Sequence, residues 1–220
     1  MLNLNSITAR LGGQTILDGA TASLPARSRV GIVGRNGAGK STLLKIIAGE
    51  MDLDDGSVET PRNTRIGYVA QEAPGGTATP FEMVLAADEE RVELLARAEQ
   101  VTDATDIADV HERLNMIDAH GAPARASRIL AGLGFDEEAQ HQPMSSFSGG
   151  WRMRVSLAGL LFSRPDLLLL DEPSNHLDLE ASLWLESFLK TYPASMVIVS
   201  HERDLLNNVA DHILHVQGGK

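Results

Sequence analysis

The 220-residue chain contains no cysteine, which excludes disulfide bonds and thiolate metal sites. That composition suits a reducing cytosol. No apolar run approaches the length needed to span a bilayer. Residues 1–6 also lack the basic start and apolar stretch of a signal peptide. We therefore predict a cytoplasmic protein with no membrane insertion.

Basic residues are also in short supply. The chain has 19 Lys and Arg residues and 30 Asp and Glu residues, so its formal net charge is −11. Such a charge argues against broad adhesion to nucleic acid or anionic lipid, and we expect no direct DNA binding. Local basic patches remain compatible with it, as Arg152 and Arg154 show.

Strand and helix patterns alternate at both ends of the chain. Short β-prone pieces occupy the first 30 residues, and Arg29–Val33 then reads as a strand leading into a helix at Lys40–Ala48. Later, the unbroken apolar strand Leu167–Leu170 precedes a helix and the strand Met196–Val199. Continuous apolar strands alternating with helices indicate an α/β fold with a parallel sheet covered on both faces.

The middle of the chain has a different pattern. Thr79, followed by Pro80 and then Glu82, matches a helix capping box, and apolar residues continue at helical spacing. We predict one domain in which residues 1–71 and 147–220 form a β/α core with a nucleotide site. Residues 72–146 form a helical insert between the two core segments.

A phosphate-binding loop lies between the first core strand and its helix. Glycines let backbone N–H groups converge on phosphate oxygens, Lys40 supplies a positive charge, and the hydroxyl of Ser41 is a ligand for Mg²⁺. A glycine turn before an ordinary helix is the alternative, which the full pattern disfavours. The predicted ATP-binding residues are Gly34, Arg35, Asn36, Gly37, Ala38, Gly39, Lys40, Ser41 and Thr42.

Two acidic residues follow the strand Leu167–Leu170. Asp171, at the carboxyl end, suits a Mg²⁺ ligand that acts through water, and Glu172 suits a general base for an attacking water. The alternative is an acidic turn after a buried strand. The upstream phosphate loop favours the functional interpretation.

The order of motifs resembles the ATP-binding-cassette (ABC) superfamily of P-loop NTPases over nearly the whole chain. After the loop come Gln71, Ser148-Gly149-Gly150, Asp171-Glu172, Asn175 to Asp178, and Ser200-His201. The sequence around Trp151 and Asn175-His176 is similar to that of the N-terminal cassette in the ABC-F branch. Members of this branch are soluble proteins with two fused cassettes, and many of them act on ribosomes. This resemblance implies an N-terminal antiparallel β subdomain, a mostly parallel core sheet and an inserted α-helical subdomain.

The resemblance also implies roles for individual residues. Ser148, Gly149 and Gly150 would contact the γ-phosphate held by a partner cassette rather than by their own. Gln71 would sense Mg²⁺ and the attacking water, and His201 would contact the γ-phosphate. Asp178 would link the two sites across the interface. The implied partner is a second cassette, fused or as a head-to-tail homodimer, and the isolated monomer would be a slow ATPase.

Some features depart from the family pattern. No aromatic residue stands near Leu11 to stack on adenine, and only one set of motifs is present. We therefore expect looser base selectivity and interpret the chain as an excised N-terminal half. Two rival functions stay open: the ATPase subunit of a membrane transporter, and a regulatory ATP switch with little turnover. Isolated motifs also have ordinary structural explanations, such as a helix cap for Ser-Gly-Gly.

Overall fold

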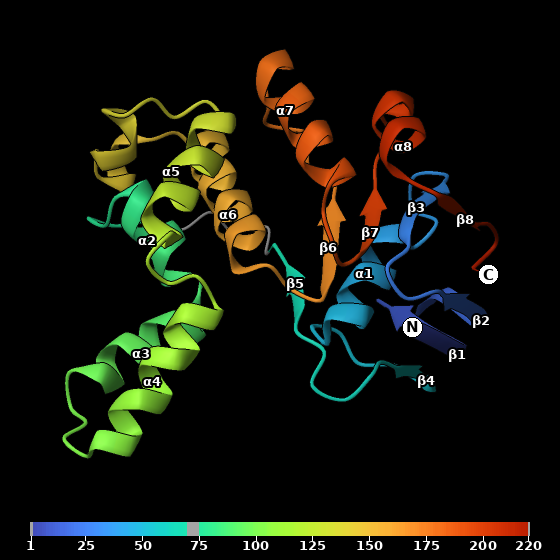
Figure 1. Cartoon of the computed structure of the whole chain (residues 1–220). Helices are drawn as coiled ribbons and strands as arrows, with labels where there is room; N and C mark the ends of the chain where they lie inside the picture. The colour runs from blue at the N-terminus through green and yellow to red at the C-terminus, as the bar shows by residue number, and fades with distance from the viewer. Residues whose placement is uncertain (1, 70–74, 220) are drawn as a thin grey trace. The chain divides into compact units, whose positions relative to one another are not determined.

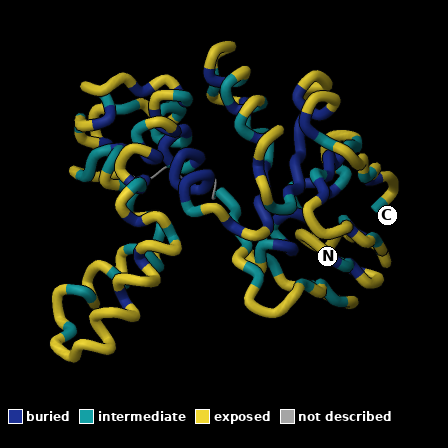
Figure 2. The backbone as a smooth tube through the Cα atoms, viewed as in Figure 1, coloured by how far each residue is buried: buried dark blue, intermediate teal, exposed yellow. Residues whose placement is uncertain are grey.

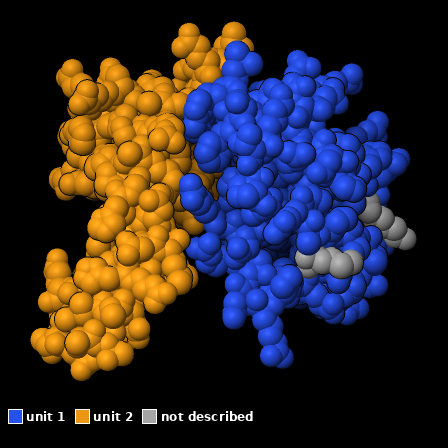
Figure 3. All heavy atoms as spheres, viewed as in Figure 1, with its two compact units in different colours: residues 1–69, 164–175, 182–220 blue, residues 70–163, 176–181 orange. Residues whose placement is uncertain are grey.

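The computed structural model describes residues 2–69 and 75–219. The chain divides into two compact units (Figure 3). Unit 1 comprises residues 1–69, 164–175 and 182–220, and unit 2 comprises residues 70–163 and 176–181. Unit 2 thus extends beyond the helical insert expected at 72–146. It also takes in the helix α6 (Gly149–Ser163), because this helix packs against two helices of the insert.

Unit 1 is built on a sheet of five parallel strands (Figure 1), in the order β5-β6-β7-β3-β8. The strands are β3 (Arg29–Gly34), β5 (Ile66–Tyr68), β6 (Leu167–Asp171), β7 (Ser195–Val199) and β8 (His212–Val216). The predicted α/β class with a parallel core sheet is confirmed.

Helices cover both faces of this sheet. On one face α1 (Lys40–Ala48) packs with apolar side chains such as Leu43 and Leu44 against alternate residues of β3, β6 and β7. On the other face Leu206 of α8 (Arg203–Val209) lies against Gly31. A further helix, α7 (Leu179–Lys190), precedes β7. The central strands β6, β7 and β3 are buried along half or more of their length, whereas the edge strands β5 and β8 are mostly half-buried or exposed (Figure 2).

A smaller antiparallel sheet adjoins α1 in the same core, in the order β2-β1-β4. Its strands are β1 (Leu2–Leu11), β2 (Gln14–Leu24) and β4 (Asp55–Glu59). The implied N-terminal antiparallel subdomain is therefore confirmed. The short β-prone pieces join into two long strands because register shifts accommodate the irregular residues within them. β4 has no counterpart among the elements expected from the sequence.

Unit 2 is helical. Its remaining helices are α2 (Pro80–Ala86), α3 (Glu89–Ala98), α4 (Ala104–Met116) and α5 (Ala122–Gly132), with 3₁₀ turns at Ala139–His141 and Met144–Ser146. The predicted capping box is confirmed. Thr79 Oγ1 accepts from the Glu82 N–H at 3.2 Å, and the Glu82 carboxylate accepts from the Thr79 N–H at 2.8 Å. A second cap at Asp88 separates α2 from α3, so the long apolar repeat forms two helices.

The helices α3 and α4 pair with each other around a small apolar core of their own, with Val110 and Leu114 at its centre. Every helix in residues 2–69 and 75–219 is too short or too polar to cross a lipid bilayer.

Candidate active site

The phosphate loop joins β3 to α1, so it leaves the sheet at the carboxyl end of a central strand. Gly39 is the N-cap of α1, with a left-handed φ of 97° and no side-chain cap on the helix. The first N–H groups of α1 therefore lack the side-chain acceptor that usually satisfies a helix start. A phosphate oxygen is the natural acceptor at such a position. Ser41 and Thr42 lie in the first turn of the same helix.

Lys40 points back over the loop. Its side chain is nearly buried, and Nζ donates to the carbonyl oxygens of Gly34 at 3.0 Å and Arg35 at 3.1 Å. An ammonium group has three N–H donors, so these two bonds leave one for a ligand oxygen. The loop thus combines uncapped backbone N–H groups with a fixed positive charge.

Close packing around the loop requires glycine at two positions. A Cβ on Gly34 would lie 2.6 Å from the carbonyl oxygen of Val216, in the neighbouring strand β8. A Cβ on Gly39 would lie 2.9 Å from Cγ2 of Ile16 in β2. Ile16 is therefore a neighbour of the phosphate loop that the sequence motifs did not single out. Leu11, expected near adenine, is 61% exposed beside the β1–β2 turn.

The acidic pair lies at the same edge of the sheet as the phosphate loop. Val199 of β7 is the register partner of Asp171 in β6 and of Ile32 in β3. The segments after these three parallel strands therefore emerge together. They carry the loop, Glu172 and His201, so the structure brings these sequence-predicted groups of unit 1 to one edge.

Glu172 and His201 are in contact. The His201 N–H donates to Glu172 Oε2 at 3.1 Å, and Nε2 of the imidazole lies 3.3 Å from Oε1. Oε1 is buried and accepts no hydrogen bond of good geometry from residues 2–69 and 75–219. A buried carboxylate oxygen without a donor fits a group that receives a proton from a water molecule.

The backbone holds Glu172 in an uncommon conformation. Its φ is +48°, in the left-handed region, where few residues other than glycine are found. The Glu172 N–H donates to the carbonyl of Val199 at 2.8 Å, and its own carbonyl accepts from the N–H of Asn175 at 3.1 Å. These two bonds fix the turn that aims the carboxylate.

Tyr68, the last residue of β5, is a further neighbour of the acidic edge. It pairs with Leu169, two residues before Asp171. Burial, followed by the negative charges of Asp171 and Glu50, raises the pKa of Tyr68 to about 12. Its hydroxyl is buried, with no hydrogen-bond partner in the described part of the chain. The only signal in the sequence is an aromatic residue at the end of a short strand.

Gln71 lies outside the described residues. Among those that are described, no three His, Asp or Glu side chains gather into a cage for a metal ion. Asp171 and the Ser41 hydroxyl nevertheless fit Mg²⁺, which usually binds through one or two protein oxygens together with substrate phosphates.

In unit 2, Ser148, Gly149 and Gly150 form the corner at which α6 begins. Ser148 and Gly149 are exposed, and a Cβ on Gly149 would meet no atom within 4 Å. A Cβ on Gly150 would lie 3.6 Å from Nδ1 of His176, an ordinary van der Waals contact. The corner therefore presents a hydroxyl and a helix start on an accessible surface.

Arg154 ties this corner to the segment that contains Asp178. Its buried guanidinium donates to the carbonyls of His176 at 2.7 Å and Leu133 at 3.0 Å, and to Asp178 Oδ2 at 2.9 Å. It also stacks on the Trp151 ring, 4.4 Å from the centroid. The Ala181 N–H, and then Arg154, lower the pKa of Asp178 by donating to its carboxylate. This arginine network is the feature of unit 2 that the motifs did not predict.

Comparison with known proteins places this geometry in a family. The family model described as ABC transporter matches residues 17–175. The Probable ATP-binding protein YheS of Escherichia coli (strain K12) is 43% identical over 220 residues, which cover 99% of this chain and 34% of that protein. The ATP-binding cassette sub-family F member 3 of Homo sapiens is 42% identical over 226 residues, covering 98% and 31%. The chain thus spans about a third of the length of these relatives.

Solved structures agree on the fold. A dimeric ATP-binding cassette in a post-hydrolysis state, bound to ADP and Pi, superimposes with a TM-score of 0.72 at 20% identity. The match covers 100% of this chain and 95% of that one. The ATP binding subunit of an ABC transporter gives a TM-score of 0.75 at 19% identity, with 100% and 87% coverage.

Proposed function

Because the chain belongs to the ABC transporter family of ATP-binding cassettes, we propose that it is an ABC-F type cassette that hydrolyses Mg-ATP only when paired with a second cassette. The observation that carries the proposal is the position of Glu172. Its buried Oε1, at the carboxyl edge of the sheet, accepts no hydrogen bond of good geometry within the described chain. The same edge carries the phosphate loop.

The chemistry follows from the groups at that edge. The uncapped start of α1 and the Lys40 ammonium bind the triphosphate, and Glu172 accepts a proton from water. The water oxygen then forms a bond to the γ-phosphorus while the bond to the bridging β–γ oxygen breaks, leaving ADP and phosphate. Mg²⁺ held near Ser41 and Asp171 would neutralise charge on the phosphates. His201 orients Glu172 and donates toward the γ-phosphate.

The second cassette supplies the missing donors. Ser148 and the first N–H groups of α6 are exposed, and a helix start with a hydroxyl is a good site for a phosphate oxygen. We assign this corner to the γ-phosphate held by a partner cassette, with Asp178 at the interface. The partner is either a second copy in head-to-tail arrangement or a second cassette of a longer protein, since the relatives are about three times as long. The isolated monomer is then a slow ATPase.

We assign the cellular work to the cytoplasm, on ribosomes during translation. The support is the similarity to a sub-family F member over almost the whole chain. A transporter subunit would instead purify with a membrane protein. Sedimentation of the chain, or of the longer protein containing it, with ribosomes in the presence of ATP checks this assignment, and recovery in the membrane fraction contradicts it.

A mixing experiment tests composite sites in a homodimer. Glu172→Gln removes the base and keeps the signature corner, whereas Ser148→Arg blocks the corner and keeps the base. Each variant alone should release little phosphate. Mixed in equal amounts, random pairing gives one intact site in half of the dimers, so about one quarter of wild-type turnover should return. A mixture as inactive as its components would contradict action in trans.

A further inference from the structure

Unit 1 contains a pocket of about 510 Å³ at the edge of the sheet opposite the phosphate loop. It is lined by residues at the amino ends of three parallel strands, including Ser28, Leu167 and Ser195. The strand register aligns these ends, since Leu167 pairs with Ser195, and Met196 with Arg29. The phosphate loop, Glu172 and His201 all follow the carboxyl ends. The pocket is therefore separate from the proposed ATP site.

Three arginines, Arg27, Arg62 and Arg164, stand around the pocket. In the part of the chain that the structure describes, none of their guanidinium groups has a hydrogen-bond or ion-pair partner. Among the described residues of the lining the only carboxylate is Asp166, which accepts from the Arg65 N–H at 3.0 Å and lies 3.6 Å from Arg65 Nε. The pocket is thus electropositive in a chain of net charge −11.

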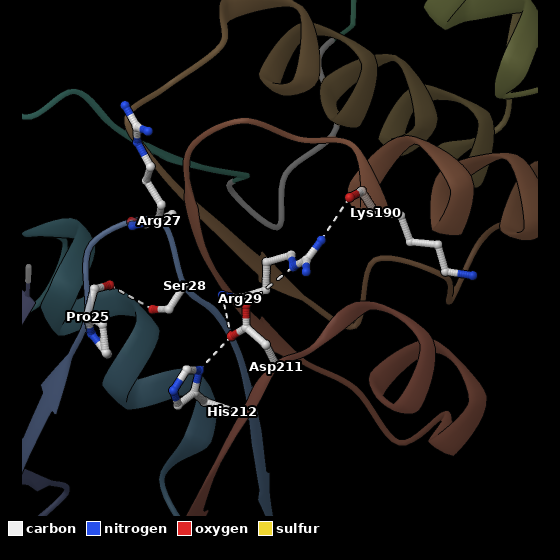
Figure 4. Close-up of polar contacts among 8 residues, drawn as sticks. Pro25, Arg27, Ser28, Arg29, Lys190, Asp211 and His212 are labelled. Atoms are coloured by element: carbon white, nitrogen blue, oxygen red, sulfur yellow. Dashed lines mark hydrogen bonds and ion pairs between the residues drawn. The ribbon is translucent and has the colours of Figure 1, made fainter.

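A neighbouring arginine shows the usual alternative. Arg29 lies 3.5 Å from the carboxylate of Asp211 and donates to the carbonyl of Lys190 at 2.8 Å. Figure 4 shows Arg27 extending away from this pair, although the two arginines are separated by one residue. Asp211 thus pairs with the Arg29 guanidinium, whereas the Arg27 guanidinium has no ion-pair partner among the described residues.

The segments that carry the free arginines have a fixed backbone. Arg27, Asn63 and Arg164 have φ values of 59°, 62° and 49°, each in the left-handed region. The Arg27 N–H donates to Ser195 Oγ at 2.8 Å, and the Arg164 carbonyl accepts from the Arg65 guanidinium at 3.0 Å. These bonds hold the loops in place, so little loop ordering would be needed when a ligand binds.

The floor of the pocket is apolar. Leu2, Leu24, Leu167 and Met196 are buried there, together with the ring of Tyr192. The Tyr192 hydroxyl donates to the carbonyl of Pro165 at 2.9 Å and is thereby occupied. The pocket therefore has an apolar floor and arginine guanidinium groups around it.

We propose that this pocket binds a nucleotide, with its phosphate on the free arginines and its base on the apolar floor. Guanidinium forks match phosphate geometry, and about 300–1,000 Å³ is the usual size of a small-ligand site. The nucleotide is either a free monophosphate or one unit of an RNA strand. The two sources share the same recognition chemistry, and the site goes beyond the proposed ATPase function.

Uridine 5′-monophosphate and a fluorescent, 5′-phosphorylated hexauridylate are suitable probes, measured by competition and by fluorescence anisotropy. The probes are titrated into protein carrying Lys40→Ala, which suppresses their binding at the phosphate loop, and binding of a non-hydrolysable ATP analogue with Mg²⁺ is measured separately on protein that keeps Lys40. The hexauridylate should bind, with an affinity that falls with salt at a logarithmic slope of about −0.7 for one neutralised phosphate. Unphosphorylated uridine should compete at least about 10-fold more weakly than the monophosphate, because each charge-assisted hydrogen bond contributes strongly.

The double variant Arg27→Gln with Arg164→Gln should weaken probe binding at least about 10-fold and leave binding of the ATP analogue unchanged. Arg128→Gln, at an exposed arginine of α5 in unit 2, is the matched control and should change neither affinity. Displacement by the monophosphate supports a free nucleotide, and binding of the hexauridylate alone supports an RNA strand. Unchanged probe binding in the double variant, or no binding of either probe at millimolar concentration, would overturn the proposal.

Discussion

Glu172 and His201 form a contact in which each residue uses two atoms. The His201 N–H donates to one carboxylate oxygen, and the imidazole Nε2 lies 3.3 Å from the other. The backbone donor is independent of the side chain at position 201. Replacing the imidazole therefore leaves one anchor of the carboxylate in place, and the two residues can be tested separately.

The first prediction concerns turnover. Glu172→Gln should lower kcat by about 10²- to 10⁴-fold because a proton acceptor is lost. His201→Ala should lower it by about 10²-fold because one donor to the reacting phosphate is lost while Glu172 stays anchored. Both variants should bind ATP as the wild type does. Steady-state phosphate release and equilibrium ATP binding, each with the partner cassette present, measure these effects.

The double variant at these positions is the control. Because the His201 imidazole is expected to act on the phosphate and Glu172 on the water, their losses should multiply in the double variant. A double variant no slower than Glu172→Gln would instead mean that His201 acts only through Glu172. Undiminished turnover in Glu172→Gln would refute its assignment as the base.

A second prediction compares two tyrosines whose hydroxyl groups are buried. The Tyr68 hydroxyl has no partner in the described chain, whereas the Tyr192 hydroxyl donates to Pro165 O at 2.9 Å. At pH 7, Tyr68→Phe should therefore leave the free energy of unfolding unchanged within about 0.5 kcal/mol or raise it, while Tyr192→Phe should lower it by about 1–2 kcal/mol. Urea denaturation checks the order. Equal destabilisation by both substitutions would show that Tyr68 has a partner.

The same tyrosine predicts an alkaline pH effect. Its pKa is raised to about 12, while an unfolded tyrosine titrates near pH 10. Between these values the unfolded chain loses a proton that the folded chain keeps, so stability falls as pH rises from about 10 to about 12. Tyr68→Phe should reduce that fall by about 1–2 kcal/mol, discounted for partial exposure. Parallel wild-type and variant stability curves across this range would contradict it.

A third prediction concerns Arg154. Arg154→Ala removes the donor to two backbone carbonyls and one of the two donors to Asp178, so it should lower the free energy of unfolding by about 2–4 kcal/mol. The free energy of unfolding of Arg154→Lys should lie between those of the wild type and Arg154→Ala, because one ammonium group cannot make all the hydrogen bonds of the planar guanidinium. The control is Arg128→Ala at an exposed position of α5, expected within about 0.5 kcal/mol of wild type. Similar losses for the two alanine variants would exclude a special role for Arg154.

A fourth prediction concerns Gly34. A methyl group there would press against the carbonyl oxygen of Val216, so Gly34→Ala should cost about 1–3 kcal/mol and weaken ATP binding by shifting the loop. Gly149→Ala meets no atom within 4 Å and should leave stability unchanged or slightly higher. Thermal unfolding separates the two. A Gly34→Ala variant with wild-type stability and ATP affinity would show that β8 can shift at Val216 to make room for the methyl group.

The sequence predicted the parallel sheet because its strands, such as Leu167–Leu170, are continuous apolar runs between helices. It also predicted the gathering of the phosphate loop with Asp171, since motifs after parallel strands meet at one edge. The helix cap at Thr79 could be predicted because its hydrogen bonds involve only Thr79 and Glu82, three residues apart. These successes depend on patterns within a few neighbouring residues.

What the sequence did not predict depends on residues far apart in the chain. β4 is short and half-polar, and it becomes a strand only because β1 pairs with it. Ile16 becomes a neighbour of Gly39 through packing of β2 on the loop, and Arg154 meets Leu133 and His176 through tertiary contacts. Patterns among neighbouring residues in the sequence do not predict such tertiary contacts. The same holds for the free arginines at the amino edge of the sheet.

The left-handed turn at Glu172 has an evolutionary consequence. A glutamate held at φ +48° stores strain of about 1–3 kcal/mol, which a glycine at that position would release. Under the proposed function, a glycine at this position would remove the catalytic base while it relieves the backbone, so an inactive sequence with glycine there would be the more stable one. Selection for turnover, rather than for folding, would then keep an acid in that place.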